Sequence, residues 1–240
     1  MSRAPIASSD EPGHQPSWYA QAALILRKDL TLELRTGEVL TTSAFFGLLV
    51  VVIGSLAFYT GPSTQAVVAA GVIWLSVAFC SVLALGRSWQ REREEGALEG
   101  LLAAPVARSA IFAGKAVGLG LFLVVVELVV VPLAAFLFLV DLGEMGQGLL
   151  VLMLLATPAI AASGTLFGSM TVRTRARELL LSVVLFPLLA PVLVTAVVAT
   201  RELLGGVPLG ELADYLKLLG LFDLVFVGGG LSLFGTLLEG

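Results

Sequence analysis

Residues 115–140 read KAVGLGLFLVVVELVVVPLAAFLFLV, an apolar run with only two charged residues, Lys115 and Glu127. A bilayer core about 30 Å thick requires roughly 20 consecutive apolar helical residues. The run does not alternate between polar and apolar side chains as a barrel strand does, so it predicts a transmembrane helix. Similar windows elsewhere bring the expected number of spans to six: residues 39–59, 66–86, 115–140, 149–170, 179–199 and 218–238.

The composition of the whole chain also indicates an integral membrane protein. The 240 residues are 58% hydrophobic and 13% charged, with a mean hydropathy of +0.99, whereas a soluble domain is about 45–50% apolar and about 25% charged. The single cysteine, Cys80, excludes an intrachain disulfide. Residues 1–38 contain no apolar core followed by a small-residue cleavage site, so we expect no removable signal peptide. The absence of a concentrated basic domain argues against a nucleic-acid partner.

The basic residues divide unevenly between the two sides of the expected membrane. Four precede the first span, five lie in or beside the segment between the second and third spans, and three lie between the fourth and fifth, twelve of the 14 in all. Only Arg201 and Lys217 fall on the other side. The positive-inside rule therefore predicts that both termini are cytoplasmic.

The chain outside the spans is expected to contain three further elements. Residues 1–17 are rich in Pro, Ser and charge, so we expect a disordered cytoplasmic tail. Residues 18–38 combine a leucine stripe with charged residues, which predicts an amphipathic interfacial helix leading into the six-helix domain of residues 39–240. Residues 200–217 mix Leu with Glu and Asp and predict a short external helix.

Residues 87–114, RSWQREREEGALEGLLAAPVARSAIFAG, are too long and too charged for a hairpin turn. Leucines and glutamates lie there at helical spacing: Leu98, Leu101 and Leu102 beside Glu94, Glu95 and Glu99. This pattern predicts a short cytoplasmic amphipathic helix over about residues 92–103. Pro105 is expected to end it, and Ser109 to cap the next span. The alternative is a solvated loop that merely satisfies the topology.

The order of residues in this segment resembles the signature of the CcmB family, the heme exporter protein B family of cytochrome c maturation. The matching residues are Glu92, Gly96, Leu98, Glu99, Leu101, Leu102, Pro105, Arg108, Ile111, Gly114 and Lys115. The likeness continues in GVIWLSVAF at residues 71–79 and in GTLFGSMTVRTRARELLLSVVLFPLLAPVLV at residues 164–194. It covers most of the chain from about residue 29 to residue 198, whereas the N-terminal tail and the segment after residue 200 depart from it.

The resemblance implies an ABC-2-type permease fold in the bacterial inner membrane and a homodimer that pairs with a separate ATPase subunit. The other implied partners are cytochrome c maturation membrane proteins and a heme chaperone. The sequence lacks a G-x-x-x-x-G-K-[ST] phosphate loop, so we expect ATP on the partner and no enzymatic activity in this chain. The residues expected to couple the chain to the ATPase are Glu92, Glu94, Glu95, Gly96, Leu98, Glu99, Leu101, Leu102, Pro105 and Arg108.

Several functions remain open on the residues alone. The complex can export heme itself or release a heme-loaded chaperone. An ABC-2 permease for a drug, lipid or glycan would have the same helices, and a non-transporting scaffold for the ATPase is a further alternative. An intramembrane enzyme is disfavoured, because the sequence has no HExxH motif, no histidine within a span and no pair of intramembrane aspartates.

Glu127 is unusual because it lies within the apolar run, and an ionised carboxylate at the bilayer centre costs at least about 2.5 kcal/mol. It is expected to be paired, protonated or facing a polar cavity. It is either a gate or substrate-path residue at a dimer axis or the partner in an ordinary hydrogen bond to a neighbouring helix. Heme ligand candidates are His14, Tyr59, Met145, Met153, Met170 and Tyr215. None of them indicates stable heme ligation, so heme is expected only as a transient cargo and no cofactor on this chain alone.

Overall fold

The computed structural model describes residues 16–58, 62–94, 100, 103–171 and 177–239, and the regular structure within these ranges is helical. The helices are α1 (Trp18–Thr36), α2 (Glu38–Ala57), α3 (Pro62–Glu94), α5 (Arg108–Leu137), α6 (Leu142–Thr171), α7 (Arg177–Leu204), the 3₁₀ helix η1 (Leu209–Leu212) and α8 (Ala213–Glu239). Among the described residues, six helices are long and apolar enough to cross a membrane, namely α2, α3, α5, α6, α7 and α8. The expected all-helical fold with six spans is confirmed.

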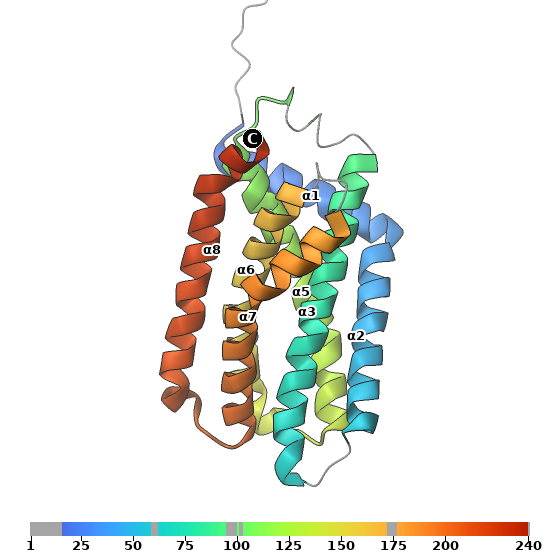
Figure 1. Ribbon diagram of the computed structural model, residues 1–240, viewed down its shortest axis with the longest axis vertical. Coiled ribbons are helices and arrows are strands. Elements are labelled where there is room, and N and C mark those ends of the chain that lie inside the picture. The colour runs from blue at the N-terminus through green and yellow to red at the C-terminus, as the bar shows by residue number, and fades with distance from the viewer. Residues whose placement is uncertain (1–15, 59–61, 95–99, 101–102, 172–176, 240) are drawn as a thin grey trace, which may run out of the picture.

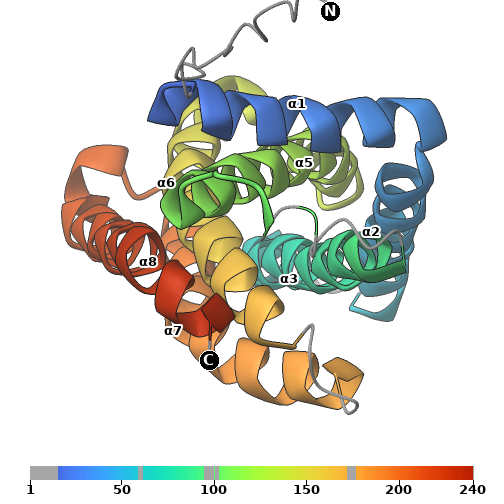
Figure 2. The same cartoon turned by 90° about the horizontal axis from the view of Figure 1, so that it is seen from above.

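The six long helices run side by side, and α1 lies across one end of the bundle (Figure 1). Seen from that end, α1 runs along α5 and reaches α2 (Figure 2). The interior of the bundle is formed by α3, α5 and α6. α3 packs against α2, α5, α6 and α7, α5 against α1, α2, α3, α6 and α8, and α6 against α3, α5, α7 and α8. The most apolar part of α6 is 72% buried, whereas that of α8 is 17% buried and lies at the flank.

A single glycine forms the corner between α1 and α2. Gly37 ends α1 and precedes α2 with a left-handed φ of 61°, a conformation that glycine adopts at little cost. Its N–H donates to the Glu33 carbonyl at 2.6 Å, and the Glu33 carboxylate accepts from the Leu40 N–H at 2.8 Å. These contacts fix the direction in which the chain leaves α1 and enters the first span.

The helices extend beyond the expected spans at the end of the bundle that α1 crosses. α3 continues to Glu94 and α5 begins at Arg108, so much of segment 87–114 belongs to these two helices. The reason is that a helix satisfies its own backbone hydrogen bonds and does not need to stop where its side chains become charged. The expected cap by Ser109 is wrong: Ala107 precedes α5 without a side-chain cap, and the Ser109 hydroxyl accepts a hydrogen bond from Trp18 instead.

The stretch 200–217 differs from the separate external helix that its composition predicts. α7 continues to Leu204, the chain turns through Gly206 at φ 92°, and η1 leads directly into α8 at Ala213. Leu212 is buried in this connection, so its leucines serve the bundle rather than a surface helix.

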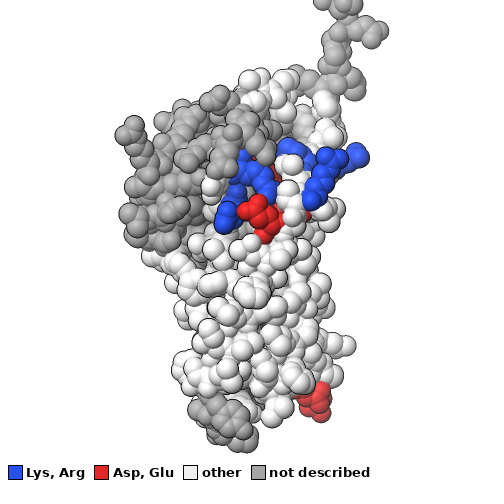
Figure 3. All heavy atoms as spheres, turned by 90° about the vertical axis from the view of Figure 1, so that its right-hand side faces the viewer, with Lys and Arg blue, Asp and Glu red and all other residues white. Residues whose placement is uncertain are grey.

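Basic side chains gather at the end of the bundle where α1 lies, whereas acidic side chains lie both there and at the opposite end (Figure 3). Among the described residues, the basic ones at this end lie on α1, on the neighbouring ends of α3 and α5, and at the first residue of α7. Arg201 and Lys217 lie at the opposite end, in the last turn of α7 and the second turn of α8. The basic residues that are unevenly distributed along the sequence are therefore also unevenly distributed between the two ends of the folded bundle.

Gly230 of α8 allows a close approach to α5. A Cβ atom at this position would overlap the ring of Phe112, which is 1% exposed and packs against Phe234 with 5.4 Å between ring centroids. The neighbouring Gly229 has no atom within 4 Å of such a Cβ. The two adjacent glycines therefore form a matched pair.

We predict that Gly230→Ala lowers the free energy of unfolding by about 1–3 kcal/mol, because the added methyl group overpacks the contact between α5 and α8. Gly229→Ala is expected to leave stability unchanged or raise it by up to about 1 kcal/mol, since alanine is the better helix former. Thermal unfolding of both variants in detergent checks this. Equal melting temperatures for the two variants would contradict the close approach.

Candidate functional site

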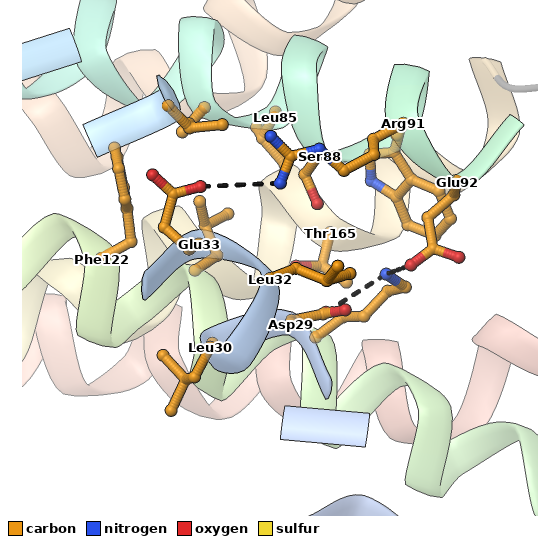
Figure 4. A pocket seen from close by; sticks show the side chains of 16 residues that line it. Asp29, Leu30, Leu32, Glu33, Leu85, Ser88, Arg91, Glu92, Phe122 and Thr165 are labelled. Carbon is orange, nitrogen blue, oxygen red and sulfur yellow. Dashed lines mark hydrogen bonds and ion pairs between the residues drawn. The ribbon is translucent and has the colours of Figure 1, made fainter. Parts of the chain in front are cut away.

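Four charged side chains from three helices meet where α1 crosses the ends of α3 and α5. We call this group the ion cluster: Lys28 and Asp29 of α1, Glu92 of α3 and Lys115 of α5. The Lys115 ammonium donates to Glu92 Oε1 at 2.8 Å and to Asp29 Oδ2 at 3.3 Å (Figure 4). Lys28 donates to the same Glu92 oxygen and lies 3.0 Å from Asp29. The cluster joins α1, α3 and α5 at one point.

The charges of the ion cluster balance, which makes its burial possible. Glu92 and Lys115 are each 5% exposed, and an unpaired buried ion would cost several kcal/mol. Burial by itself lowers the pKa of Lys28, but the nearby carboxylates of Asp29 and Glu92 outweigh it and raise that pKa above its usual 10.5. Lys28 therefore remains protonated at neutral pH, and the cluster holds two cations against two anions.

Trp89 makes a further contact that positions the Lys115 ammonium. The ammonium lies 5.0 Å from the centroid of the Trp89 ring, within the range of a cation–π interaction. Trp89 is 2% exposed and packs directly on Gly168 of α6, where a Cβ atom would overlap the indole. The close packing of α3 on α6 thus determines where the lysine can sit.

α1 also holds the beginning of α5. The Ala107 N–H donates to the Gln21 side chain at 2.9 Å, and the Trp18 indole N–H donates to the Ser109 hydroxyl at 2.9 Å. A Cβ atom at Gly114 would come within 2.7 Å of the Ala22 carbonyl oxygen, so the two helices touch backbone to backbone. The chain between α3 and α5 is therefore held at both of its ends by α1.

The structure corrects the expected position of Glu92. The sequence predicts it on a separate cytoplasmic helix that faces a partner, whereas it lies in the last turn of α3 and is buried between two lysines. The physical reason is that Lys28 and Lys115 supply the countercharges that a buried carboxylate requires. Pro105 is exposed, and Arg108 is half-buried in the first turn of α5.

Most of the other residues expected to couple the chain to an ATPase lie outside the described residues. These are Glu95, Gly96, Leu98, Glu99, Leu101 and Leu102. Glu94 ends α3, and its side chain is also outside the description. Their coupling role remains a prediction from the sequence.

Sequence reasoning did not find the roles of Lys28, Asp29 and Trp89. Lys28 and Asp29 were visible as polar residues of an amphipathic helix, but their contacts lie 64 and 86 residues away in the chain. No local pattern indicates such pairs. The one available signal was an excess of opposite charges at the ends of three predicted helices.

Glu127 of α5 forms a hydrogen bond to a neighbouring helix within the membrane region. The Thr157 hydroxyl of α6 donates to Glu127 Oε1 at 2.7 Å, and the glutamate is 4% exposed. It also borders a pocket of about 120 Å³ between α5 and α6 whose other lining side chains, among them Val131 and Met153, are apolar. The hydrogen-bond partner of Glu127 on the neighbouring helix is thus a threonine.

Three of the candidate heme ligands have side chains within the described residues. Met145 and Met153 lie on α6, with Met153 buried, and Tyr215 lies near the start of α8. His14, Tyr59 and the Met170 side chain lie outside the described residues.

Comparisons with known proteins agree with this architecture. The profile of the family described as CcmB protein matches residues 20–230. The chain belongs to the CcmB family. Heme exporter protein B of Rhodobacter capsulatus is 33% identical over 202 residues, which cover 79% of this chain and 88% of that protein. The proteins of the same name from Bradyrhizobium diazoefficiens and Haemophilus influenzae are 28% and 26% identical, over 76% and 72% of this chain and 82% and 77% of their own lengths.

The two ends of the segment that resembles the CcmB signature are in contact in the structure. Glu92 and Lys115 are the first and last residues of the segment that resembles the family signature, and their side chains lie 2.8 Å apart. The segment between them therefore begins and ends at one buried ion pair.

We predict that Glu92→Gln and Lys115→Met each lower the free energy of unfolding by about 3 kcal/mol, because each leaves a buried charge without its partner. The double variant should lose less than the sum of the two, since both changes remove the same interaction. Unfolding in mixed detergent micelles measures all three values.

The matched control is the more exposed pair of Arg201 and Glu202, with 2.6 Å between charged atoms, at the opposite end of the bundle. Arg201→Met and Glu202→Gln should each change stability by less than about 1 kcal/mol. Strictly additive losses for Glu92 and Lys115 would show that the two side chains do not interact.

For Glu127 we predict that Thr157→Val lowers the free energy of unfolding by about 1–3 kcal/mol, because it removes the donor to a buried carboxyl group. Glu127→Gln should change it by less than about 1 kcal/mol, since the amide oxygen still accepts from Thr157. Unfolding in detergent provides both numbers. The reverse order would show that the hydrogen bond is not what stabilises this position.

Proposed function

We propose that the chain is the membrane permease subunit of an ABC transporter complex that serves heme export in cytochrome c maturation. The observation that carries the proposal is the match to the CcmB family over residues 20–230, with relatives named heme exporter protein B, on a chain with six membrane-crossing helices. A separate ATPase subunit hydrolyses ATP, since the sequence has no phosphate loop of its own. The role of the chain is the same whether heme or a heme-loaded chaperone is released.

The geometry supports a coupling role for the segment between α3 and α5. Its two ends are joined by Glu92 and Lys115, and α1 contacts both of them. A displacement of the segment by a bound ATPase therefore acts on α1, α3 and α5 together. Residues 94–102 make the contact with the partner, and the buried ion cluster transmits it into the membrane helices.

The remaining features of the proposal follow from the same arrangement. The end with the ion cluster faces the cytoplasm, because basic residues are retained on that side, and both termini lie there. The complex contains two copies of this chain, since an ABC transporter needs two membrane halves. Other cytochrome c maturation proteins and the heme chaperone act with it in the bacterial inner membrane. A Glu127→Gln variant that folds as the wild type but abolishes export would identify Glu127 as a gate.

The test is copurification with an ABC ATPase subunit of the same organism that is coexpressed with this chain. We predict that a Glu95→Lys, Glu99→Lys, Leu102→Asp variant retains at most about a tenth of the ATPase bound by the wild type, a loss equivalent to about 1.4 kcal/mol or more. The physical reason is that the changes reverse the charge and interrupt the leucine face of the expected contact.

A control with equally drastic changes at the other end is Glu211→Lys, Asp214→Lys, both exposed in the connection that leads into α8. It should bind the ATPase as the wild type does. Equal copurification by all three proteins would overturn the coupling assignment and favour a cargo or scaffold role that does not use this segment.

A further inference from the structure

A pocket of about 100 Å³ lies beside the ion cluster, between α1, α3, α5 and α6 (Figure 4). One water requires about 10–15 Å³ of comparable space, so the pocket exceeds a single buried water several-fold. Its wall is divided into an apolar and a charged part. Leu30, Leu119 and Phe122 form the apolar part, and the charged part consists of Asp29, Glu33, Arg91, Glu92 and Lys115. This division matches an amphiphilic molecule.

The wall of the pocket also carries hydroxyl groups. Thr165 of α6, which is 2% exposed, and Ser88 of α3, which is half-buried, both line it. Among the described residues, the buried side-chain oxygen of this wall that has no hydrogen-bond partner is Glu92 Oε2. A buried acceptor without a donor costs about 1–3 kcal/mol, which a donating ligand in the pocket would recover.

Arg91 has spare donors at the same wall. Its guanidinium makes one long hydrogen bond, 3.4 Å to the Thr36 hydroxyl, within the described part of the chain. Its contacts with the Glu33 and Glu38 carboxylates, at 3.8 and 3.7 Å, are longer than hydrogen bonds. A guanidinium has five N–H groups and binds phosphate well, so most of its donor capacity is available.

The acceptors of the pocket are the carboxylates of Asp29 and Glu33, which remain about one-fifth exposed. Together with Lys28, the charged groups around the pocket comprise three cations and three anions. An anionic ligand would disturb this balance, whereas a zwitterion would not. A phosphate suits Arg91 and the two hydroxyls, and a primary ammonium suits the carboxylates.

We propose that this pocket binds the headgroup of an ethanolamine phospholipid. The phosphate accepts from Arg91, Ser88 and Thr165, the ammonium donates to Asp29 and Glu33, and an acyl chain lies along Leu30, Leu119 and Phe122. The source is a lipid rather than a soluble phosphoethanolamine, because the apolar wall continues toward the spans from the end where their charged residues begin. A choline headgroup has no N–H donor for the carboxylates and should bind less well.

The test is native mass spectrometry of the full chain, delipidated in detergent and titrated with phosphatidylethanolamine, phosphatidylcholine or phosphatidylglycerol of identical acyl chains. We expect one retained phosphatidylethanolamine per chain, bound several-fold more tightly than the other two. Soluble glycerophosphoethanolamine should not compete at equal concentration. Thr165→Val, which keeps the shape and removes the hydroxyl, should weaken retention by about three- to tenfold, the effect of one hydrogen bond.

The matched control is Thr195→Val on α7, whose hydroxyl donates to the Pro191 carbonyl of its own helix and does not line the pocket. It should retain the lipid as the wild type does. Arg91→Gln should weaken retention by more than tenfold, since it removes a charged donor. Equal retention of the three lipids, unchanged retention in Thr165→Val, or no lipid retained at all would each overturn the proposal.

Discussion

The need to neutralise a buried carboxylate governs the end of the bundle where this chain does its proposed work. Glu92 is taken out of water, and only ammonium groups close to it make that burial tolerable. Those groups come from α1 and α5, so a requirement of one side chain determines how three helices meet. The position of α1, the path of the chain into α5 and the walls of the adjoining pocket all depend on this arrangement.

The spans could be predicted from the sequence because the physical requirement is simple and local. A helix that crosses a bilayer needs about twenty apolar residues, and each window can be examined without knowing the others. The helix ends were less predictable, since α3 and α5 continue past their apolar stretches to Glu94 and back to Arg108. Hydropathy indicates where an apolar stretch ends, whereas the helical backbone continues beyond that point.

The site was predicted only in part, because its contacts join residues far apart in the chain. The sequence marked Glu92 and Lys115 as ends of a distinctive segment but not as partners, and it assigned Glu92 to a surface that the structure shows to be buried. For Glu127, the free-energy cost of a carboxylate in the membrane was enough to predict a partner, a proton or a polar surrounding. Only the folded structure identifies Thr157 as that partner. The residues expected to contact an ATPase lie largely outside the described ranges, so sequence remains their support.

The way α1 is held has a consequence for the order of events during biosynthesis. α1 is made before α3 and α5, yet its contacts with Glu92, Ala107 and Ser109 join residues 64, 86 and 91 positions apart. While a ribosome is still producing the second span, Lys28 and Trp18 have none of these partners, and α1 can only rest against the lipid surface. It docks once the third span has entered the membrane, so α1 is synthesised before the first two spans but reaches its place after them.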